Sequence, residues 1–221
     1  MIATIQYNSR KLQIDLSKPL DISMPIISSK KNVNAWYIDE PKIEPIKDAE
    51  WIASVSKGAS VNFNNIYFNP HAHGTHTECA GHITEKVYSI NQNLKTFFFL
   101  AEVITVAPEN DNEDKIISKK QLQFAIGNKK RDAIILRTIP NTREKLSRQY
   151  SHTNWPYLKE DAVKFMVSKG VKHLLIDLPS IDKEKDGGEL LGHNAFWNTK
   201  GKLRLDATIT ELIYVSNKIE D

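Results

Sequence analysis

Twelve consecutive residues hold the densest group of potential metal ligands in this sequence. The segment from His71 to His82 contains four of the seven histidines of the 221-residue chain, together with Glu78 and Cys79. Neutral imidazoles and carboxylates are ligands that zinc and related divalent ions prefer in proteins. Crowding them together is costly unless a cation or a reaction uses them. We therefore expect a metal site in this segment.

His76 and Glu78 form the best-placed pair of ligands. On an extended segment, side chains two residues apart point to the same side, so both can reach one ion. Gly74 permits a sharp turn of the backbone, so that His71 or His73 can fold back toward the same ion. The spacing does not choose between these two histidines.

The segments around the cluster predict an α/β protein. Val61–Phe68 alternates like a strand and leads into the cluster. Glu160–Ser168 has apolar residues at helical spacing, and His173–Leu178 is typical of a central strand. A strand, helix, strand succession after a β-rich first half favours one α/β domain over residues 1–221 with a mixed sheet. Further expected elements are a hairpin of Ala3–Tyr7 and Lys11–Leu16 with one buried face, loops and short elements over residues 26–57, a buried strand within Thr96–Val106, a serine-capped helix over Ser118–Ile126, a strand at Ala133–Leu136 and a last strand within Arg204–Val215.

Composition argues against several classes of protein. The net charge of +3 comes from 30 basic and 27 acidic residues spread along the chain, which gives no support for nucleic-acid binding. The densest basic run, Lys129–Arg131, is expected to be a solvated turn. The start Met1–Thr4 lacks a secretory signal, and no apolar run reaches the roughly 18 residues of a membrane-spanning helix. We expect a cytoplasmic protein that binds a small molecule, without a membrane or nucleic-acid partner.

The single cysteine, Cys79, excludes an intrachain disulfide and is expected to be a small buried residue.

The histidine cluster resembles a motif of the cyclase family of metal-dependent hydrolases, which includes kynurenine formamidase. The family motif is HxGTHxDxPxH. Gly74–His76 matches it outright, Glu78 stands at the aspartate, and His82 stands at the last histidine. Ala80 replaces the proline, and Ala72 occupies the position of the first histidine, with a histidine on either side. Other segments similar to the family are Asp15-Leu16-Ser17 with Pro19, Leu136-Arg137-Thr138, and Ile176-Asp177 followed by Ser180-Ile181-Asp182.

The resemblance implies a ligand set, a fold and an assembly. In the family, the first two histidines and the aspartate of the motif bind one ion, and the aspartate also reaches a second ion that a distant histidine and glutamate complete. The family has a swivelling β/β/α fold and usually forms homo-oligomers, and the expected metal is zinc or, alternatively, manganese, with one or two ions per chain. Carried over, the ligands are His76, Glu78, His193 and Glu211, and for the remaining position we favour His71 over His73.

The resemblance also implies a reaction. His82 matches the catalytic histidine of the family and would take a proton from the attacking water and pass it to a leaving amine. The expected activity is hydrolysis of an amide or formamide C–N bond, most concretely of an arylformamide such as N-formylkynurenine. A lyase or cyclase in which the metal stabilises an enolate is the rival enzyme. A metal-binding protein without catalysis is the third hypothesis, because Ala72 and Ala80 depart from the motif.

Two further groups of residues have structural as well as functional interpretations. Asp177 is expected to be a turn or cap carboxylate. Large aromatic side chains usually pack in the core, but three tryptophans are candidates for an aromatic wall against a planar substrate. They are Trp51, Trp155 and Trp197.

Overall fold

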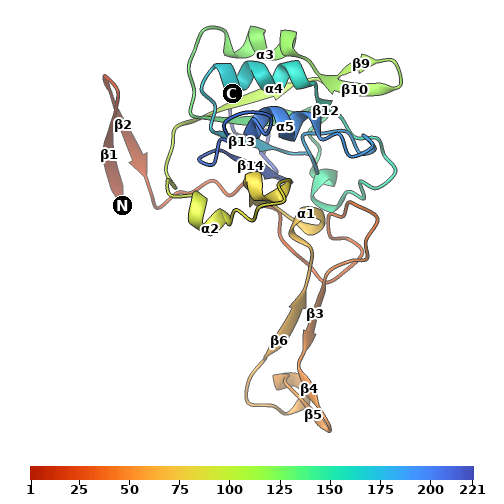
Figure 1. The fold of residues 1–221 in the computed structure, drawn as a ribbon. Helices are drawn as coiled ribbons and strands as arrows, with labels where there is room; N and C mark the ends of the chain where they lie inside the picture. Colours follow the sequence, from red (N-terminus) through yellow and green to blue (C-terminus); the bar gives the residue numbers. More distant parts are fainter.

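The computed structural model describes residues 1–221 and is built around a five-stranded sheet in the order β7-β14-β13-β11-β8 (Figure 1). Four neighbouring strands are parallel, and β7 at the edge pairs antiparallel with β14. The apolar run predicted as a central strand does form the middle of the sheet, as β13. The fold is therefore α/β with a mixed sheet. The strands are β7 (His76–Glu78), β8 (Ala101–Val106), β11 (Ala133–Thr138), β13 (His173–Ile176) and β14 (Thr208–Glu211).

Three helices lie side by side over the sheet, namely α3 (Lys119–Ile126), α4 (Glu160–Ser168) and α5 (Leu191–Trp197) (Figure 1). α3 begins at Ser118 with a capping box in which the Ser118 side chain accepts from the backbone of Gln121 and the Gln121 side chain accepts from the backbone of Ser118. The predicted bounds of α4 agree with the structure. None of the helices is long and apolar enough to cross a membrane.

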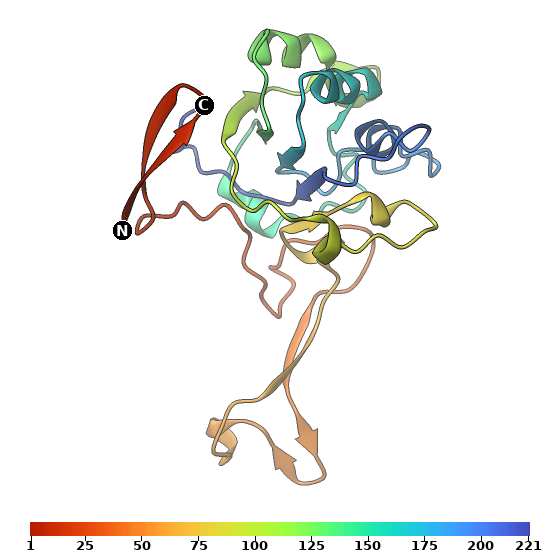
Figure 2. The ribbon, with the colours of Figure 1, turned by 60° about the vertical axis from the view of Figure 1, so that its left-hand side comes forward.

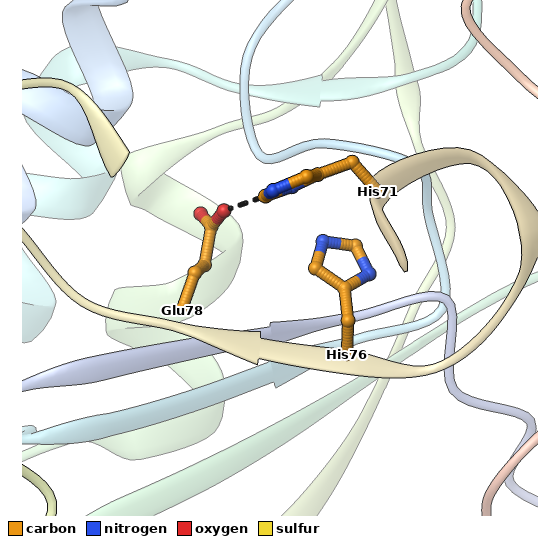
Figure 3. Close-up of side chains that lie close together, drawn as sticks. All are labelled: His71, His76 and Glu78. Carbon is orange, nitrogen blue, oxygen red and sulfur yellow. Dashed lines mark ion pairs between the residues drawn. The ribbon is translucent and has the colours of Figure 1, made fainter. Parts of the chain in front are cut away.

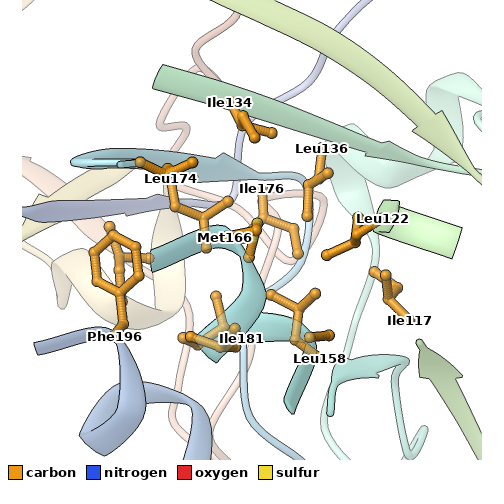
Figure 4. Close-up of a cluster of buried hydrophobic side chains, with 14 of the residues drawn as sticks. Ile117, Leu122, Ile134, Leu136, Leu158, Met166, Leu174, Ile176, Ile181 and Phe196 are labelled. Carbon is orange, nitrogen blue, oxygen red and sulfur yellow. The ribbon is translucent and has the colours of Figure 1, made fainter. Parts of the chain in front are cut away.

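The main hydrophobic core lies between these helices and the sheet (Figure 4). Leu136 and Ile176 from the strands meet Leu122, Met166 and Phe196 from the helices, and all five side chains are fully buried. Burying such a side chain contributes about 1.5–3 kcal/mol relative to leaving it exposed. The core also includes Ile209 and therefore fixes β14, the strand that ends at the candidate ligand Glu211.

Shorter elements complete the molecule. β10 pairs with β9 on one side and with β12 on the other, in a separate small sheet. These elements are β9 (Glu109–Asp111), β10 (Asp114–Ile117), β12 (Tyr157–Leu158), the helices α1 (Pro70–His73) and α2 (Ile90–Asn93), and 3-10 turns at Val55–Lys57, Ala80–His82 and Arg143–Ser147.

The N-terminal hairpin forms as predicted but without a buried face. β1 (Ile2–Tyr7) pairs antiparallel with β2 (Arg10–Asp15), and the hairpin stands beside the body of the molecule (Figure 2). Ile5 and Ile14 remain 38% and 36% exposed. The alternation of the sequence produced the strands, but no second layer of structure covers either side.

Residues 42–67 form an arm that projects away from the body (Figures 1 and 2). β3 (Lys42–Pro45) pairs with β6 (Asn64–Tyr67), and the short strands β4 (Lys47–Asp48) and β5 (Trp51–Ile52) pair at the tip. The structure agrees with the expectation of loops and short elements up to Lys57, and the strand predicted at Val61–Phe68 forms over the shorter range of β6. Large apolar side chains are exposed along the arm, including Trp51, Val55, Val61, Phe63, Ile66 and Tyr67.

The strand predicted within Thr96–Val106 is present only in its second half. β8 begins at Ala101, which pairs with Ala133, the first residue of β11. Residues 96–100 therefore precede the point at which the parallel strand β11 begins, and they have no strand to pair with. Phe97 and Phe98 are 69% and 89% exposed, so the expectation that this apolar run is buried is wrong for its first five residues.

Candidate metal centre

The edge of the sheet brings three of the candidate ligands together. His76 and Glu78 lie on β7 and point to the same side, as their spacing predicts (Figure 3). Glu211 ends the neighbouring strand β14 and stands opposite His76 in the strand register. Oε2 of Glu211 is 3.5 Å from Nε2 of His76. Both side chains are almost fully buried, so the site lies within the protein rather than on its surface.

His71 is the histidine that folds back to this pair. Asn69 accepts a hydrogen bond from the backbone of His71, and Pro70 occupies the first position of α1, so this short helix starts at a defined residue. Nδ1 of His71 lies 3.3 Å from Oε2 of Glu78, and its ring centroid is 4.6 Å from that of His76 (Figure 3). His71, His76 and Glu78 thus form a group in which one ligand atom from each lies within 4.8 Å of the others.

His73 points away from this group. It lies two residues after His71 on the helical turn, about 200° around the axis. Its Nδ1 accepts a hydrogen bond from the backbone of Asn69, and its Nε2 is 2.8 Å from the carbonyl oxygen of Asp39. Both ring nitrogens are engaged in a buried position. The structure therefore distinguishes the two histidines that the sequence left open.

Glu78 also connects this group to the distant histidine. His193 is the third residue of α5, and its Nε2 is 3.0 Å from Oε1 of Glu78. The same nitrogen is 3.7 Å from Oε1 of Glu211. Glu78, His82 and His193 form a second group with ligand atoms within 4.8 Å of one another. Because Glu78 belongs to both groups, the arrangement has room for one ion or for two ions that share this carboxylate.

Two buried atoms show that the residues fit a cation. Nε2 of His76 and Oε2 of Glu78 are shielded from solvent, and neither has a hydrogen-bond partner. The 3.3 Å approach of His71 to Oε2 is an ion-pair distance without acceptable hydrogen-bond geometry. Buried polar atoms normally have a partner, because leaving one unsatisfied costs about 1–3 kcal/mol. Coordination to a divalent ion would satisfy both atoms.

Burial and close charges shift the pKa values in this cluster in opposite directions. Burial alone would raise the pKa of Glu78, but the hydrogen bond from His193 and the close approach of His71 hold it well below its usual range. Burial alone would lower the pKa of His193, but hydrogen bonds to Asp182 and Glu78 raise it to about 10. Burial raises the pKa of Glu211, and the negative charge of Glu78 adds to this effect. Metal binding to this cluster must therefore displace protons.

His82 lies at the open side of the cluster. Its side chain is 35% exposed, its ring stacks on that of His71 at a centroid distance of 4.4 Å, and its Nε2 is 3.5 Å from Oε2 of Glu78. Burial of the ring lowers the pKa of His82 below its ordinary value of 6.5. A neutral imidazole in this position can accept a proton from a molecule bound beside Glu78.

The turn that carries His82 depends on close packing. A Cβ added to Gly81 would lie 2.1 Å from the carbonyl oxygen of Tyr88, so only glycine fits at this position. The same carbonyl accepts a hydrogen bond from Sγ of Cys79 at 3.1 Å, and Cys79 is buried, as expected from the sequence. The contact with Tyr88 thus fixes the turn at the position from which His82 reaches the cluster.

Asp177 is not the turn or cap carboxylate that the sequence predicts. It is fully buried and accepts a hydrogen bond from Nζ of Lys145 at 2.7 Å, as well as bonds from the backbone and hydroxyl of Thr138. Lys145 lies in the turn Arg143–Ser147 and is itself buried. A buried carboxylate needs such a partner, which is remote in the sequence and has no local signature.

The tryptophans do not form a wall around the cluster in this chain. Trp155 and Trp197 are core residues with 1% and 0% exposure, and Trp51 lies at the tip of the arm. Trp197 packs against His193 with a ring distance of 5.3 Å, from the side of the core.

The sequence did not predict helix α5, which positions His193. Its short sequence contains Gly192 and has no side-chain cap, so no local signal marks its start.

Residues 14–183 match the family model Cyclase, described as "Putative cyclase". The chain belongs to the cyclase family. No curated protein sequence matches the chain significantly. His193 and Glu211 lie beyond the matched residues, so their place in the centre rests on the geometry described above.

Solved structures with the same fold include several hydrolases. A predicted metal-dependent hydrolase from Bacillus stearothermophilus is 15% identical, with a TM-score of 0.60, and the match covers 91% of this chain and 85% of that one. An isatin hydrolase bound to the product analogue thioisatinate is 14% identical, with a TM-score of 0.61 and coverages of 91% and 81%. Isatin hydrolase A from Labrenzia aggregata, bound to benzyl benzoate, is 12% identical, with a TM-score of 0.60 and coverages of 91% and 82%. This cyclase-family chain therefore has the fold of these proteins.

Proposed function

We propose that this cyclase-family chain is a metal-dependent hydrolase that cleaves an amide or formamide C–N bond. The observation that carries the proposal is the pair of buried, unpartnered atoms on His76 and Glu78, in a cluster with His71 and His193. The names of the structural neighbours, a metal-dependent hydrolase and two isatin hydrolases, support the same class of reaction. An arylformamide such as N-formylkynurenine is the most concrete substrate.

The residues would divide the reaction between binding and proton transfer. A bound divalent ion would lower the pKa of a water molecule and polarise the substrate carbonyl. His71, His76 and Glu78 would hold this ion, and Glu78, His193 and Glu211 would hold a second one. Nε2 of His82, on the open side, would take a proton from the attacking water and deliver it to the leaving nitrogen.

The metal content of the protein tests the centre directly. Elemental analysis of protein purified without a histidine tag or added metal should find about one to two equivalents of zinc or manganese per chain. The Glu78→Ala variant should hold less, because Glu78 belongs to both ligand groups. Wild-type protein that holds no metal and takes up none on addition would contradict the proposal.

Turnover in isotopically labelled water separates hydrolysis from its rivals. A screen of aryl formamides and cyclic amides with the metal-loaded protein should yield a product acid that carries heavy oxygen from the solvent. A lyase or cyclase would release a product without this label. Tight metal binding without turnover of any amide would favour the third hypothesis, a metal-binding protein without catalysis.

We also propose that the chain works as a homo-oligomer. An isolated two-stranded ribbon is marginally stable in water, and large exposed apolar patches usually mark interaction surfaces. The projecting arm of residues 42–67 has both features. Light scattering should give a mass above the 25.2 kDa of one chain, and Phe63→Asp on the arm should reduce it. A monomeric wild-type mass would contradict this proposal.

The cytoplasmic location of the protein stays a prediction.

A further inference from the structure

The turn that follows β13 contacts both distal ligands of the centre. The backbone N–H of Ile181 donates a hydrogen bond to Oε1 of Glu211 at 2.9 Å. The neighbouring residue, Asp182, has its Oδ2 2.6 Å from Nδ1 of His193. One short segment therefore contacts a glutamate on β14 and a histidine on α5, two elements that are separate in the sequence.

The carboxylate of Asp182 is used entirely by the first turn of α5. Its Oδ1 accepts from the backbone N–H of Gly192 at 2.6 Å, and its Oδ2 accepts from the backbone N–H of His193 at 3.1 Å in addition to the ring. Asp182 is 4% exposed. A Cβ added to Gly192 would lie 2.6 Å from Oδ1, so the glycine allows the helix to approach this closely.

The backbone of Asp182 is itself held in place. Its N–H donates to the hydroxyl of Ser180 at 3.1 Å, and its carbonyl accepts from Nε1 of Trp155 at 3.2 Å. Trp155 is 1% exposed and packs in the second hydrophobic core cluster. Asp182 is therefore a fixed acceptor, since neither its backbone nor its side chain can move without breaking buried hydrogen bonds.

We infer that Asp182 is the positioning residue for His193 in the proposed metal centre. A carboxylate only accepts hydrogen bonds, so Nδ1 of the ring must carry the proton. In the neutral ring this leaves the lone pair on Nε2, the nitrogen that lies 3.0 Å from Glu78 and 3.7 Å from Glu211. Asp182 thus selects the tautomer and the ring orientation in which His193 can bind a cation between these two carboxylates. This inference rests on the proposed function.

Zinc affinity, measured by competition with a chromophoric chelator, tests this inference. Asp182→Asn keeps the size of the side chain but replaces one acceptor oxygen by a donor group, and it should weaken zinc binding by about 10- to 100-fold, as is typical for such outer partners of a ligand. Asp177→Asn is the matched control, because Asp177 is equally buried but pairs with Lys145 and Thr138. It should leave zinc affinity unchanged.

The outcomes separate the inference from the proposed function. Equal zinc affinity in folded Asp182→Asn and in the wild type would overturn the role of Asp182 and leave the metal centre standing. A wild type that binds no zinc would overturn both. If Asp182→Asn does not fold, nitrogen NMR of the zinc-loaded wild type decides instead. It should show His193 protonated at Nδ1 and bare of hydrogen at Nε2, and the opposite tautomer would overturn the inference.

Discussion

His76 and Glu211 stand opposite each other across the antiparallel pair of β7 and β14, and their side chains end 3.5 Å apart. The pairing of two strands from opposite parts of the chain thus sets the geometry of two candidate ligands. The pair also joins the two groups of the centre, since Glu211 lies near His193 as well. Any change that alters the register of this sheet edge would disrupt the centre before it affected the core.

Replacing His71 and His73 of α1 separately by alanine should separate effects on metal binding from effects on stability. His71→Ala removes a side chain 3.3 Å from Glu78 and should weaken zinc binding at least about tenfold with little change in unfolding. His73→Ala removes both buried hydrogen bonds of that ring and should lower the free energy of unfolding by about 1–3 kcal/mol, with zinc affinity nearly unchanged. Metal titration and urea unfolding measure the two effects. If only His73→Ala lost zinc affinity, the ligand would be His73, and the assignment of His71 would be wrong.

Removing the side chain of His82 should affect turnover and leave metal content unchanged. General acid–base catalysis contributes about 10²–10⁴-fold, so kcat/KM of His82→Ala should fall by that order. The ring is partly exposed and only 3.5 Å from Glu78, but the first group of ligands is complete without it. Elemental analysis of the same preparation provides the control. Full activity in the variant would exclude His82 from the mechanism, and loss of metal would identify it as a ligand.

The pH dependence of turnover should report the shifted pKa of His82. Burial lowers this pKa below its ordinary value of 6.5, so the ring stays neutral and able to accept a proton in mildly acidic solution. Activity should be present above this lowered pKa and be lost as the pH falls through it. The acid limb of kcat/KM against pH should therefore lie below 6.5. An acid limb above that value would mean that another group limits the rate.

The stability of metal-free protein should fall as the pH rises. The folded state raises the pKa of His193 from 6.5 to about 10, because Asp182 and Glu78 hydrogen-bond the charged ring despite its burial. The stabilisation is fully present below the unfolded pKa of 6.5 and is lost as the pH rises through the folded value near 10. Zinc competes with these protons, so the stabilisation that zinc adds should grow over the same range. Urea unfolding with chelator and with zinc, at several pH values from 6.5 upward, measures both trends. Metal-free stability that rises with pH would contradict the charged form of His193.

Local patterns in the sequence predicted part of this structure well. The helix at Glu160–Ser168 follows from the spacing of apolar side chains, and the central strand predicted at His173–Leu178 follows from an apolar run and ends two residues earlier, at Ile176. The same-side placement of His76 and Glu78 follows from strand alternation alone. These features depend on residues within one element, so the sequence contains the information directly.

Long-range contacts account for what the sequence did not reveal. His73 is held away from the cluster by a contact with the carbonyl oxygen of Asp39, and Asp177 depends on a lysine from a distant turn. The strand expected within Thr96–Val106 lacks its first five residues because β11 begins opposite Ala101. Positions such as these are set by which segments become neighbours, and no local spacing encodes that.

Substituting Gly81 should show how closely the turn at His82 is fixed. Gly81→Ala would place a methyl group 2.1 Å from the carbonyl oxygen of Tyr88, where backbone on both sides must shift. Because His82 directly follows Gly81, whereas β7 ends three residues earlier at Glu78, we expect turnover to fall with zinc content preserved, together with a destabilisation of about 1–3 kcal/mol. Cys79→Ala is the matched control, since it removes the other contact to Tyr88 without adding a clash. Steady-state kinetics and elemental analysis of both variants measure the effect. Gly81→Ala with wild-type kcat/KM would show that the position of His82 does not depend on this contact.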